Sequence, residues 1–393
     1  MNINLLNIGI VNSSPFCRIN NNLFINPAEF KSLQQWFLLF KNITLFKPEV
    51  KMKKHPDGWV KLNKNIRVIS ICNFDDNFFQ RYFALVKNSK SHLCKIDLLY
   101  ARMPNYESYW AFKVAKSLSI PLIIELHGDW SESVLEEDKR SPLRLITRHI
   151  RSLVVDYFIK EMSSYASIFI SIGPSLYYKY SHYGKPSLIS TNNLLSLKHY
   201  CKRSSFSLNR PPKILFVGDI QRRKGLHILF EALNILNSLN FEFNLTLVGS
   251  GHFEAYLRNY ARKYNFIDSV NFVGRISHGE RLFSFYKNSD IFVLPSVASE
   301  GVPRVTHEAM ALGCPVIATN IGSISWQLNN NSGILIEKNN AKALANAIIS
   351  LLTNLKLRRK ISNNAYIKAK EYSLEAQKKR LRSFIYKNIK TVC

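Results

Sequence analysis

Short apolar runs alternate with longer stretches of helical period along most of the chain. Runs of this kind, closed by glycine, proline or polar residues, are typical of buried strands in a parallel sheet. The predicted strands are 2–11, 66–71, 96–100, 122–126, 167–172, 187–190, 214–217, 244–248, 270–273, 291–294, 316–319 and 332–336. Apolar spacings of three and four predict helices over 29–41, 76–87, 106–118, 139–155, 226–239, 303–312, 341–352, 356–370 and 374–389. This alternation predicts an α/β fold with doubly wound parallel sheets.

The length of 393 residues favours two domains, each large enough to bury its own core. A polar stretch over 204–212, which ends in Pro-Pro, is the predicted linker. We therefore expect domains over 1–205 and 206–373, followed by a C-terminal helix. Residues 47–64 are rich in lysine and poorly periodic, which predicts a solvated loop or an acceptor-side or membrane-side contact.

The formal net charge of +27 would attract polyanions such as nucleic acid, anionic lipid or a phosphorylated substrate. Compositional drift explains the charge equally well, because the lysines are spread along the chain. The helix predicted over 139–155 has a basic stripe and an apolar stripe, formed by Arg140, Arg144, Arg148 and Arg151 and by Leu143, Ile146, Ile150 and Val154. Such a helix either lies on an anionic membrane or packs through its apolar residues with a solvated basic face.

The six cysteines include no C-x-x-C pair, which argues against a zinc site or a disulfide framework and fits a reducing compartment. The N-terminus has no basic leader, and no run is long and apolar enough to span a bilayer. We expect a cytoplasmic protein. No D-x-D triplet occurs, so we expect neither a metal nor any other cofactor.

The densest candidate chemistry lies between the strands 291–294 and 316–319. Glu300 is on the loop that enters the helix, Glu308 is two turns inside it, and Gly301 permits close backbone approach to a ligand. Free N–H groups of the first helical turn favour an anion. Acids that bind hydroxyls beside an anion site suit a nucleotide sugar. Alternatively, Glu308 forms an ordinary i,i+4 pair with Arg304 and Glu300 is a loop acid.

Two further loops follow predicted strands. In GDIQRRKG (218–225), three cations crowd a helix N-terminus, where the helix dipole disfavours them unless a diphosphate binds there; a solvated basic turn is the alternative. His127 follows the strand 122–126 and is placed to face a crevice, unless it is a structural histidine.

The stretch EGVPRVTHEAMALGCPVIAT, followed by Asn320-Ile321-Gly322-Ser323, resembles the Glu-x7-Glu signature of the retaining family-4 glycosyltransferases. This resemblance implies a GT-B fold, in which two Rossmann-like domains face each other across a cleft. It also implies that segment 374–393 crosses back to the first domain. By the same resemblance, Glu308 binds the ribose hydroxyls of the donor and Glu300 the sugar hydroxyls. Lys224 and Arg222 neutralise the departing diphosphate.

The resemblance also assigns donor contacts to Gly218, Gly301, Val302, Pro303, Arg304 and Arg275, the last near the base, while His127 orients the transferred sugar. The chain departs from the family pattern at Asp219, where an arginine is usual, and in its first loop, which has no glycine pair.

We therefore expect a metal-independent retaining glycosyltransferase that moves a sugar from a nucleotide sugar to a saccharide or lipid-linked saccharide. Family analogy suggests bacterial envelope polysaccharide biosynthesis at the inner face of the cell membrane. A sugar-nucleotide 2-epimerase on the same fold is the alternative. A nucleic-acid-binding protein is disfavoured, because the sequence has no helix-turn-helix, zinc finger or aromatic RNP-type motif.

Overall fold

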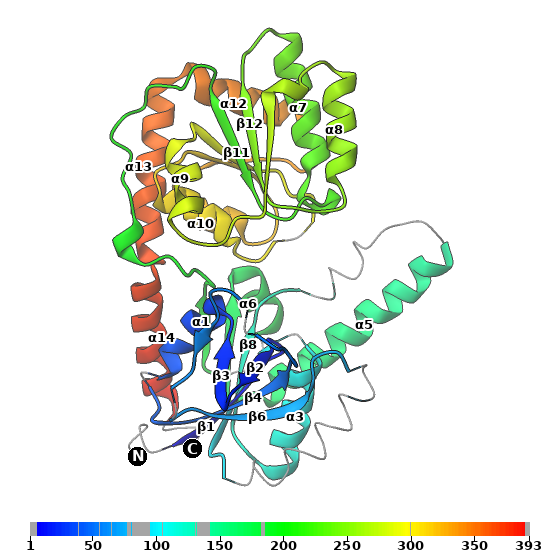
Figure 1. Cartoon of the computed structure of the whole chain (residues 1–393), viewed down its shortest axis with the longest axis vertical. Coiled ribbons are helices and arrows are strands. Elements are labelled where there is room, and N and C mark those ends of the chain that lie inside the picture. Colours follow the sequence, from blue (N-terminus) through cyan, green and yellow to red (C-terminus); the bar gives the residue numbers. More distant parts are fainter. Residues whose placement is uncertain are drawn as a thin grey trace. The chain divides into compact units, whose positions relative to one another are not determined.

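The computed structural model describes residues 6–37, 39–54, 56–63, 65–76, 80, 95–103, 105–129, 131, 142–181, 185–298 and 300–389, without the side chains of 35 and 142–148. The described residues form two compact units. Unit 1 comprises those up to Leu194 together with those from Gln377 onward, and unit 2 runs from Leu195 to Ala376. Each has its own sheet (Figure 1).

Unit 1 is built on a ten-stranded sheet in the order β10-β9-β8-β7-β1-β4-β2-β3-β5, with β6 also paired to β4. Its strands are β1 (Asn7–Val11), β2 (Phe16–Ile19), β3 (Asn22–Ile25), β4 (Asn42–Glu49), β5 (Val60–Lys61), β6 (Arg67–Asn73), β7 (Leu98–Met103), β8 (Leu122–Leu126), β9 (Ile168–Ile172) and β10 (Ser187–Ser190). All pairings are parallel except those of β3 with β2 and β5. The strand order reverses between β1 and β7, where ligands of such sheets bind.

Helices cover both faces of this sheet. One core cluster contains Leu33 and Trp36 of α1 (Pro27–Phe37) and Leu381 and Ile385 of α14 (Leu374–Ile389). The other contains residues of α3 (Tyr106–Leu118), α5 (Pro142–Tyr165) and α6 (Pro174–Tyr180). Residues of α14 therefore complete the core of unit 1.

Unit 2 is built on a six-stranded, fully parallel sheet in the order β13-β12-β11-β14-β15-β16. Its strands are β11 (Lys213–Val217), β12 (Asn244–Val248), β13 (Val270–Gly274), β14 (Ile291–Leu294), β15 (Val316–Thr319) and β16 (Ile334–Ile336). Its α-helices are α7 (Leu226–Ser238), α8 (Glu254–Lys263), α9 (Glu280–Asn288), α10 (Arg304–Ala311), α11 (Ile324–Gln327), α12 (Ala341–Thr353) and α13 (Leu355–Glu371). The order reverses between β11 and β14. One apolar cluster forms the core.

The predicted α/β architecture is confirmed, and several elements, such as the helix over 106–118 and the strand over 122–126, have the expected bounds. The helix predicted over 76–87 lies almost entirely outside the described residues. The prediction of a solvated loop over 47–64 was wrong at its start. Lys47 lies in β4, is 1% exposed and pairs with Glu29 of α1. A charged residue in the middle of a sheet is buried only because tertiary partners neutralise it.

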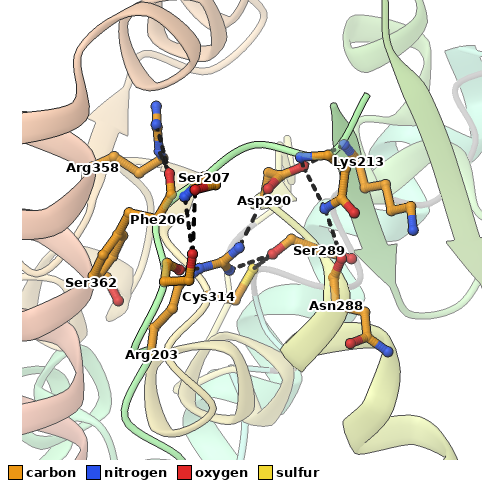
Figure 2. A network of polar contacts seen from close by, with 12 residues as sticks. Arg203, Phe206, Ser207, Lys213, Asn288, Ser289, Asp290, Cys314, Arg358 and Ser362 are labelled. Atoms are coloured by element: carbon orange, nitrogen blue, oxygen red, sulfur yellow. Dashed lines mark hydrogen bonds and ion pairs between the residues drawn. The ribbon is translucent and has the colours of Figure 1, made fainter. Parts of the chain in front are cut away.

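The stretch predicted as a linker, 204–212, belongs to unit 2. Figure 2 shows the polar contacts that fix it there. Asp290, which precedes β14, accepts hydrogen bonds from the backbone of Lys213 (2.8 Å) and from Arg203 (3.3 Å). Arg358 of α13 donates to the backbone oxygen of Phe206, 2.8 Å from Nη2, and the Phe206 side chain is buried. The composition of the stretch is linker-like, but its contacts are those of a domain edge.

Among the helices that the structure describes, none combines the length and the apolar composition needed to cross a membrane.

Candidate active site

The candidate site of unit 2 lies where the carboxyl ends of β11 and β14 meet, at the reversal of strand order. In parallel α/β sheets this is the position at which ligands bind. The loop after β11 carries Lys224, and the loop after β14 carries Glu300. Two segments that lie far apart in the sequence are therefore brought together.

Glycines let these loops approach closely. Gly225 ends the short 3-10 helix Arg222–Lys224 in the left-handed region, with φ of 69°, and a Cβ there would lie 1.8 Å from Pro295 O. A Cβ at Gly249, after β12, would lie 1.8 Å from Gly218 O. The glycines at 249 and 251 thus permit close backbone packing against the loop over 218–225.

Lys224 and Glu300 contact each other directly. Lys224 Nζ lies 2.5 Å from Glu300 Oε1, and the two side chains are only 13% and 12% exposed. The hydroxyl of Ser296, directly after β14, donates to the same carboxylate oxygen at 2.8 Å. The Glu300 carboxylate is therefore held by a cation and by a hydroxyl, and Lys224 is held by that carboxylate.

The backbone of Glu300 is also fixed. Ser323 N–H donates to Glu300 O at 3.0 Å, and a Cβ at Gly322 would lie 2.0 Å from that oxygen. The Gly322-Ser323 pair after β15 therefore anchors the loop that carries the acid. This contact gives a physical role to residues that the sequence singled out only through the family resemblance.

Glu308 lies on α10 and is buried, whereas Arg304 at the start of the same helix is exposed. The Tyr286 hydroxyl donates to Glu308 Oε2 at 2.9 Å, and His278 Nε2 lies 3.4 Å from Oε1. Burial, and then the neighbouring carboxylate of Glu308, raise the pKa of Tyr286 well above its usual value. Among the described residues, Glu308 is therefore part of a buried polar cluster rather than of a surface pair with Arg304.

The remaining predicted donor residues surround this centre. Gly301, Val302 and Pro303 lead into α10, and Val302 is buried. The N–H groups of the first turn of α10 have no partner within the helix and so present donors at its tip. Arg304 begins the helix.

The other predicted basic residues lie farther out. The Arg222 guanidinium lies 6.0 Å from the centre of the Phe253 ring. Arg275 is 75% exposed and pairs with Asp219 at 3.2 Å. Asp219, which stands where the family has an arginine, thus holds an arginine supplied by the loop after β13.

Unit 1 carries its own polar cluster at the carboxyl ends of β7 and β8. Arg102 Nη2 lies 3.0 Å from His127 Nδ1, and because arginine can only donate, this nitrogen accepts. His127 Nε2 then donates to Glu125 Oε1 at 2.5 Å, and Tyr100 donates to Glu125 Oε2 at 2.7 Å. Both ring nitrogens of His127 therefore have partners within unit 1.

The charges of this cluster set the pKa of Glu125. Burial alone would raise it, but His127, Arg102 and the Tyr100 hydroxyl outweigh burial and lower the pKa to about 2. His127 and Arg102 also line a cavity of about 310 Å³ together with Asn12, Ser13, Ser14, Met103, Asn105 and Gly128. Asn12 in turn accepts from the buried Lys47 at 2.7 Å.

Sequence reasoning did not identify Ser296, Tyr286, His278, Glu125 or Arg102 as parts of these clusters. Glu125 had a local signal, since it lies two residues before His127 at the end of one strand. The others come from separate elements and meet only in the folded units. No group of three or more potential ligand side chains among the described residues is arranged to hold a metal ion.

Comparisons with known proteins show which families and folds the chain resembles. Residues 202–368, which lie within unit 2, match the model of the family Glycosyl transferases group 1. An uncharacterized glycosyltransferase of Haemophilus influenzae is 31% identical over 190 residues, which cover 47% of this chain and 53% of the relative. The capsular polysaccharide biosynthesis glycosyltransferase CapM of Staphylococcus aureus is 35% identical over 150 residues, covering 38% of this chain and 39% of CapM. The chain thus matches about half the length of the first of these relatives.

Solved structures confirm the predicted GT-B fold. Sucrose-phosphate synthase of Thermosynechococcus elongatus has a TM-score of 0.73 and 20% identity, with 99% of this chain and 100% of that chain covered. Anabaena HepE in complex with UDP-glucose has a TM-score of 0.69 and 16% identity, with 97% and 100% covered.

Proposed function

We propose that this chain is a retaining glycosyltransferase that transfers a sugar from a nucleotide sugar to a saccharide or lipid-linked saccharide acceptor. The observation that carries the proposal is the contact between Lys224 and Glu300 at the strand-order reversal of unit 2. The group 1 domain over 202–368 supports it. CapM, by its name, serves capsular polysaccharide biosynthesis, which favours an envelope polysaccharide as the product.

In the proposed complex, the donor separates Lys224 from Glu300 and supplies each of them with a new partner of suitable charge. The diphosphate binds Lys224, Arg222 and the N–H groups at the tip of α10, so that negative charge meets cations and the positive end of a helix. The sugar hydroxyls donate to Glu300, and Glu308 accepts from the ribose hydroxyls. Gly301, Val302 and Pro303 present main chain to the donor, and Gly218 and Arg275 border the nucleotide.

The reaction breaks the bond between the anomeric carbon and the diphosphate oxygen, and the electron pair stays on that oxygen. The acceptor hydroxyl oxygen forms the new bond from the same face, and its proton passes to the departing phosphate. Negative charge therefore grows on the diphosphate, and stabilising it by Lys224 and Arg222 lowers the barrier. In this proposal basic side chains, rather than a metal ion, carry that charge.

His127 of unit 1 is proposed to orient the transferred sugar. Because both of its ring nitrogens have protein partners, a sugar hydroxyl would have to exchange with Arg102 or with Glu125. The cavity of about 310 Å³ beside it provides the space from which such a hydroxyl approaches.

The test is Lys224→Ala, assayed for transfer from a panel of nucleotide sugars, with UDP-glucose first because the Anabaena neighbour binds it. We expect a fall in kcat of about 10²–10³, typical of losing one group that stabilises developing charge. Arg223→Ala is the matched control, since Arg223 lies in the same loop, is exposed and bonds Gln221. Equal activity of Lys224→Ala and wild type would refute the proposal.

The configuration of the product tests the mechanism separately. NMR of the anomeric proton should show the same configuration in the donor and in the new linkage. An inverted linkage would refute the retaining mechanism, and a nucleotide sugar recovered as its 2-epimer would replace the transferase by the alternative isomerase.

A further inference from the structure

The helix α5 of unit 1 has two unlike halves. Its C-terminal half packs into the unit, where Ile159 and Met162 are buried and the Phe158 ring lies 4.8 Å from that of Tyr109. The N-terminal part extends away from the sheet of unit 1 (Figure 1). The packing that anchors α5 therefore accounts for only half of its length.

The exposed part of α5 carries an apolar stripe. Ile150, Leu153, Val154 and Tyr157 are 56%, 70%, 45% and 63% exposed. Their spacing of three, four and seven residues places them on one face of the helix. Across the described residues, the other large exposed apolar side chains are spread over many elements, whereas these four fall within eight residues. A contiguous stripe of this kind marks an interaction surface, unlike single exposed apolar residues.

The charge pattern of α5 decides what kind of partner fits the stripe. Between Pro142 and Val155 the helix has three arginines, Arg144, Arg148 and Arg151, and no acidic residue. Positions 144, 148 and 151 recur at four and three residues, so the helical period places them on another face of the backbone than positions 150, 153, 154 and 157. An apolar face combined with a basic face is the pattern of helices that lie in the interface of an anionic membrane.

Self-association through the same stripe is disfavoured electrostatically. Two copies of a chain with a formal net charge of +27 repel each other, whereas an anionic surface attracts each copy. We propose that α5 docks unit 1 on an anionic lipid bilayer, with Ile150, Leu153, Val154 and Tyr157 inserted at the headgroup boundary and the arginines pairing with lipid phosphates. This inference does not depend on the proposed reaction.

The experiment is flotation of the full chain with vesicles of phosphatidylcholine containing about 30% phosphatidylglycerol, or of phosphatidylcholine alone. We expect binding to the anionic vesicles at low salt, and loss of binding at about 1 M salt, where the Debye length is about 3 Å. Two double variants separate the contributions: Leu153→Gln with Val154→Gln removes apolar surface, and Arg148→Gln with Arg151→Gln removes charge. Each double variant loses two side chains that contact the bilayer, so we expect its partition coefficient for the anionic vesicles to fall about tenfold.

Matched controls exclude general effects of the substitutions. Ile367→Gln removes an equally exposed aliphatic side chain from α13, and Arg382→Gln removes an exposed cation from α14. Both should bind vesicles as the wild type does, and circular dichroism should show all variants folded. The proposal is overturned if wild type does not bind at low salt, or if it binds neutral vesicles equally. It is also overturned if the double variants bind as wild type does, or if sedimentation shows a dimer that Leu153→Gln dissolves.

Discussion

The two ends of strand β14 carry two carboxylates that are both well buried but are held in different ways. Asp290, at the amino end, accepts from the backbone N–H groups of Lys213 (2.8 Å) and Asn209 (3.2 Å), from the Asn209 side chain (2.9 Å) and from Arg203. Glu300, on the loop after the carboxyl end, contacts the side chains of Lys224 and Ser296.

The difference lies in what a ligand can replace. Main-chain donors belong to the fold, so releasing Asp290 from them would break the edge of unit 2 shown in Figure 2. A lysine and a hydroxyl on loops can exchange their partner for a phosphate or a sugar hydroxyl without such a loss. Burial and charge alone therefore do not identify a functional acid; the nature of its partners does.

The largest effect is expected where the structural carboxylate is removed. Asp290→Ala removes the carboxylate that accepts from Arg203 Nη2 and from two backbone N–H groups, and we expect the unfolding free energy of unit 2 to fall by about 3–5 kcal/mol. Urea unfolding, read by hydrogen exchange of peptides that cover β14, measures it. Asp268→Ala, at an exposed acid of the same unit, should change stability by less than about 0.5 kcal/mol. If Asp290→Ala lowers the unfolding free energy no more than Asp268→Ala does, Asp290 is not a structural carboxylate and does not differ from Glu300 in this way.

The second prediction concerns Glu300. Glu300→Gln keeps the hydrogen bond with Ser296 but loses the charge that pairs with Lys224, so we expect kcat/KM to fall by about 10²–10³. The unfolding free energy should change by no more than about 1 kcal/mol, since no main-chain contact of the side chain is lost. The same urea experiment and a donor-turnover assay measure the two quantities. A variant that is active but unstable would reverse the interpretation of the two ends of β14.

The sequence analysis identified Glu300 as a candidate functional acid but made no prediction about Asp290. Glu300, Glu308 and Lys224 were recognised because their motifs are local, each within one loop or one helical turn of a strand end. The partners that distinguish Glu300 from Asp290 are not local. Asn209 and Arg203 lie in a stretch whose composition is that of a linker, and only its tertiary contacts place it in unit 2.

In unit 1, more of the structure depends on contacts between distant residues, so less of it was predicted from the sequence. The antiparallel strands β2 and β3, which are joined by Asn20 and Asn21 with positive φ, are absent from the strands predicted from the sequence. Lys47 made the end of β4 resemble a solvated loop, although in the fold Glu29 neutralises its charge and Asn12 accepts a hydrogen bond from it. The roles predicted for the site residues in donor binding stay predictions.

The third prediction concerns the pH dependence of stability, which we assign to His307 and not to its neighbour Glu308 on α10. Burial lowers the pKa of His307 to about 3, from 6.5, and its Nε2 lies 2.7 Å from the Tyr200 hydroxyl, which bonds Ala369 O. The unfolded state therefore takes up the proton first as pH falls. The contribution of neutral His307 to the unfolding free energy is therefore fully present above about pH 6.5. It decreases as the pH falls toward 3, by at most about 1.4 kcal/mol per pH unit.

Urea unfolding of unit 2 at several pH values between about 7 and 4 measures this slope. In His307→Gln the slope should become shallower, while donor binding at neutral pH stays within about twofold, because His307 bonds residues of the fold and Glu308 faces the proposed ribose. An unchanged slope would show that His307 is not the group that loses stability in acid.

The smallest effect concerns the two carboxylate oxygens of Glu308. We expect one oxygen to be held by the fold, as Asp290 is, and the other to be available to a ligand, as Glu300 is. Tyr286 is fully buried and donates to Oε2, whereas the His278 side chain, which is 27% exposed, lies 3.4 Å from Oε1. Tyr286→Phe removes one hydrogen bond to a charged group, worth about 1.5–3 kcal/mol at most, and leaves Oε1 able to accept. We expect the donor KM to rise about fivefold with kcat nearly unchanged, since only the orientation of a binding residue is lost. The matched variant His278→Asn should leave Oε2 bound to Tyr286 and raise KM less. If Tyr286→Phe instead lowers kcat with KM unchanged, Glu308 acts in the transition state rather than in binding, and its two oxygens cannot be divided in this way.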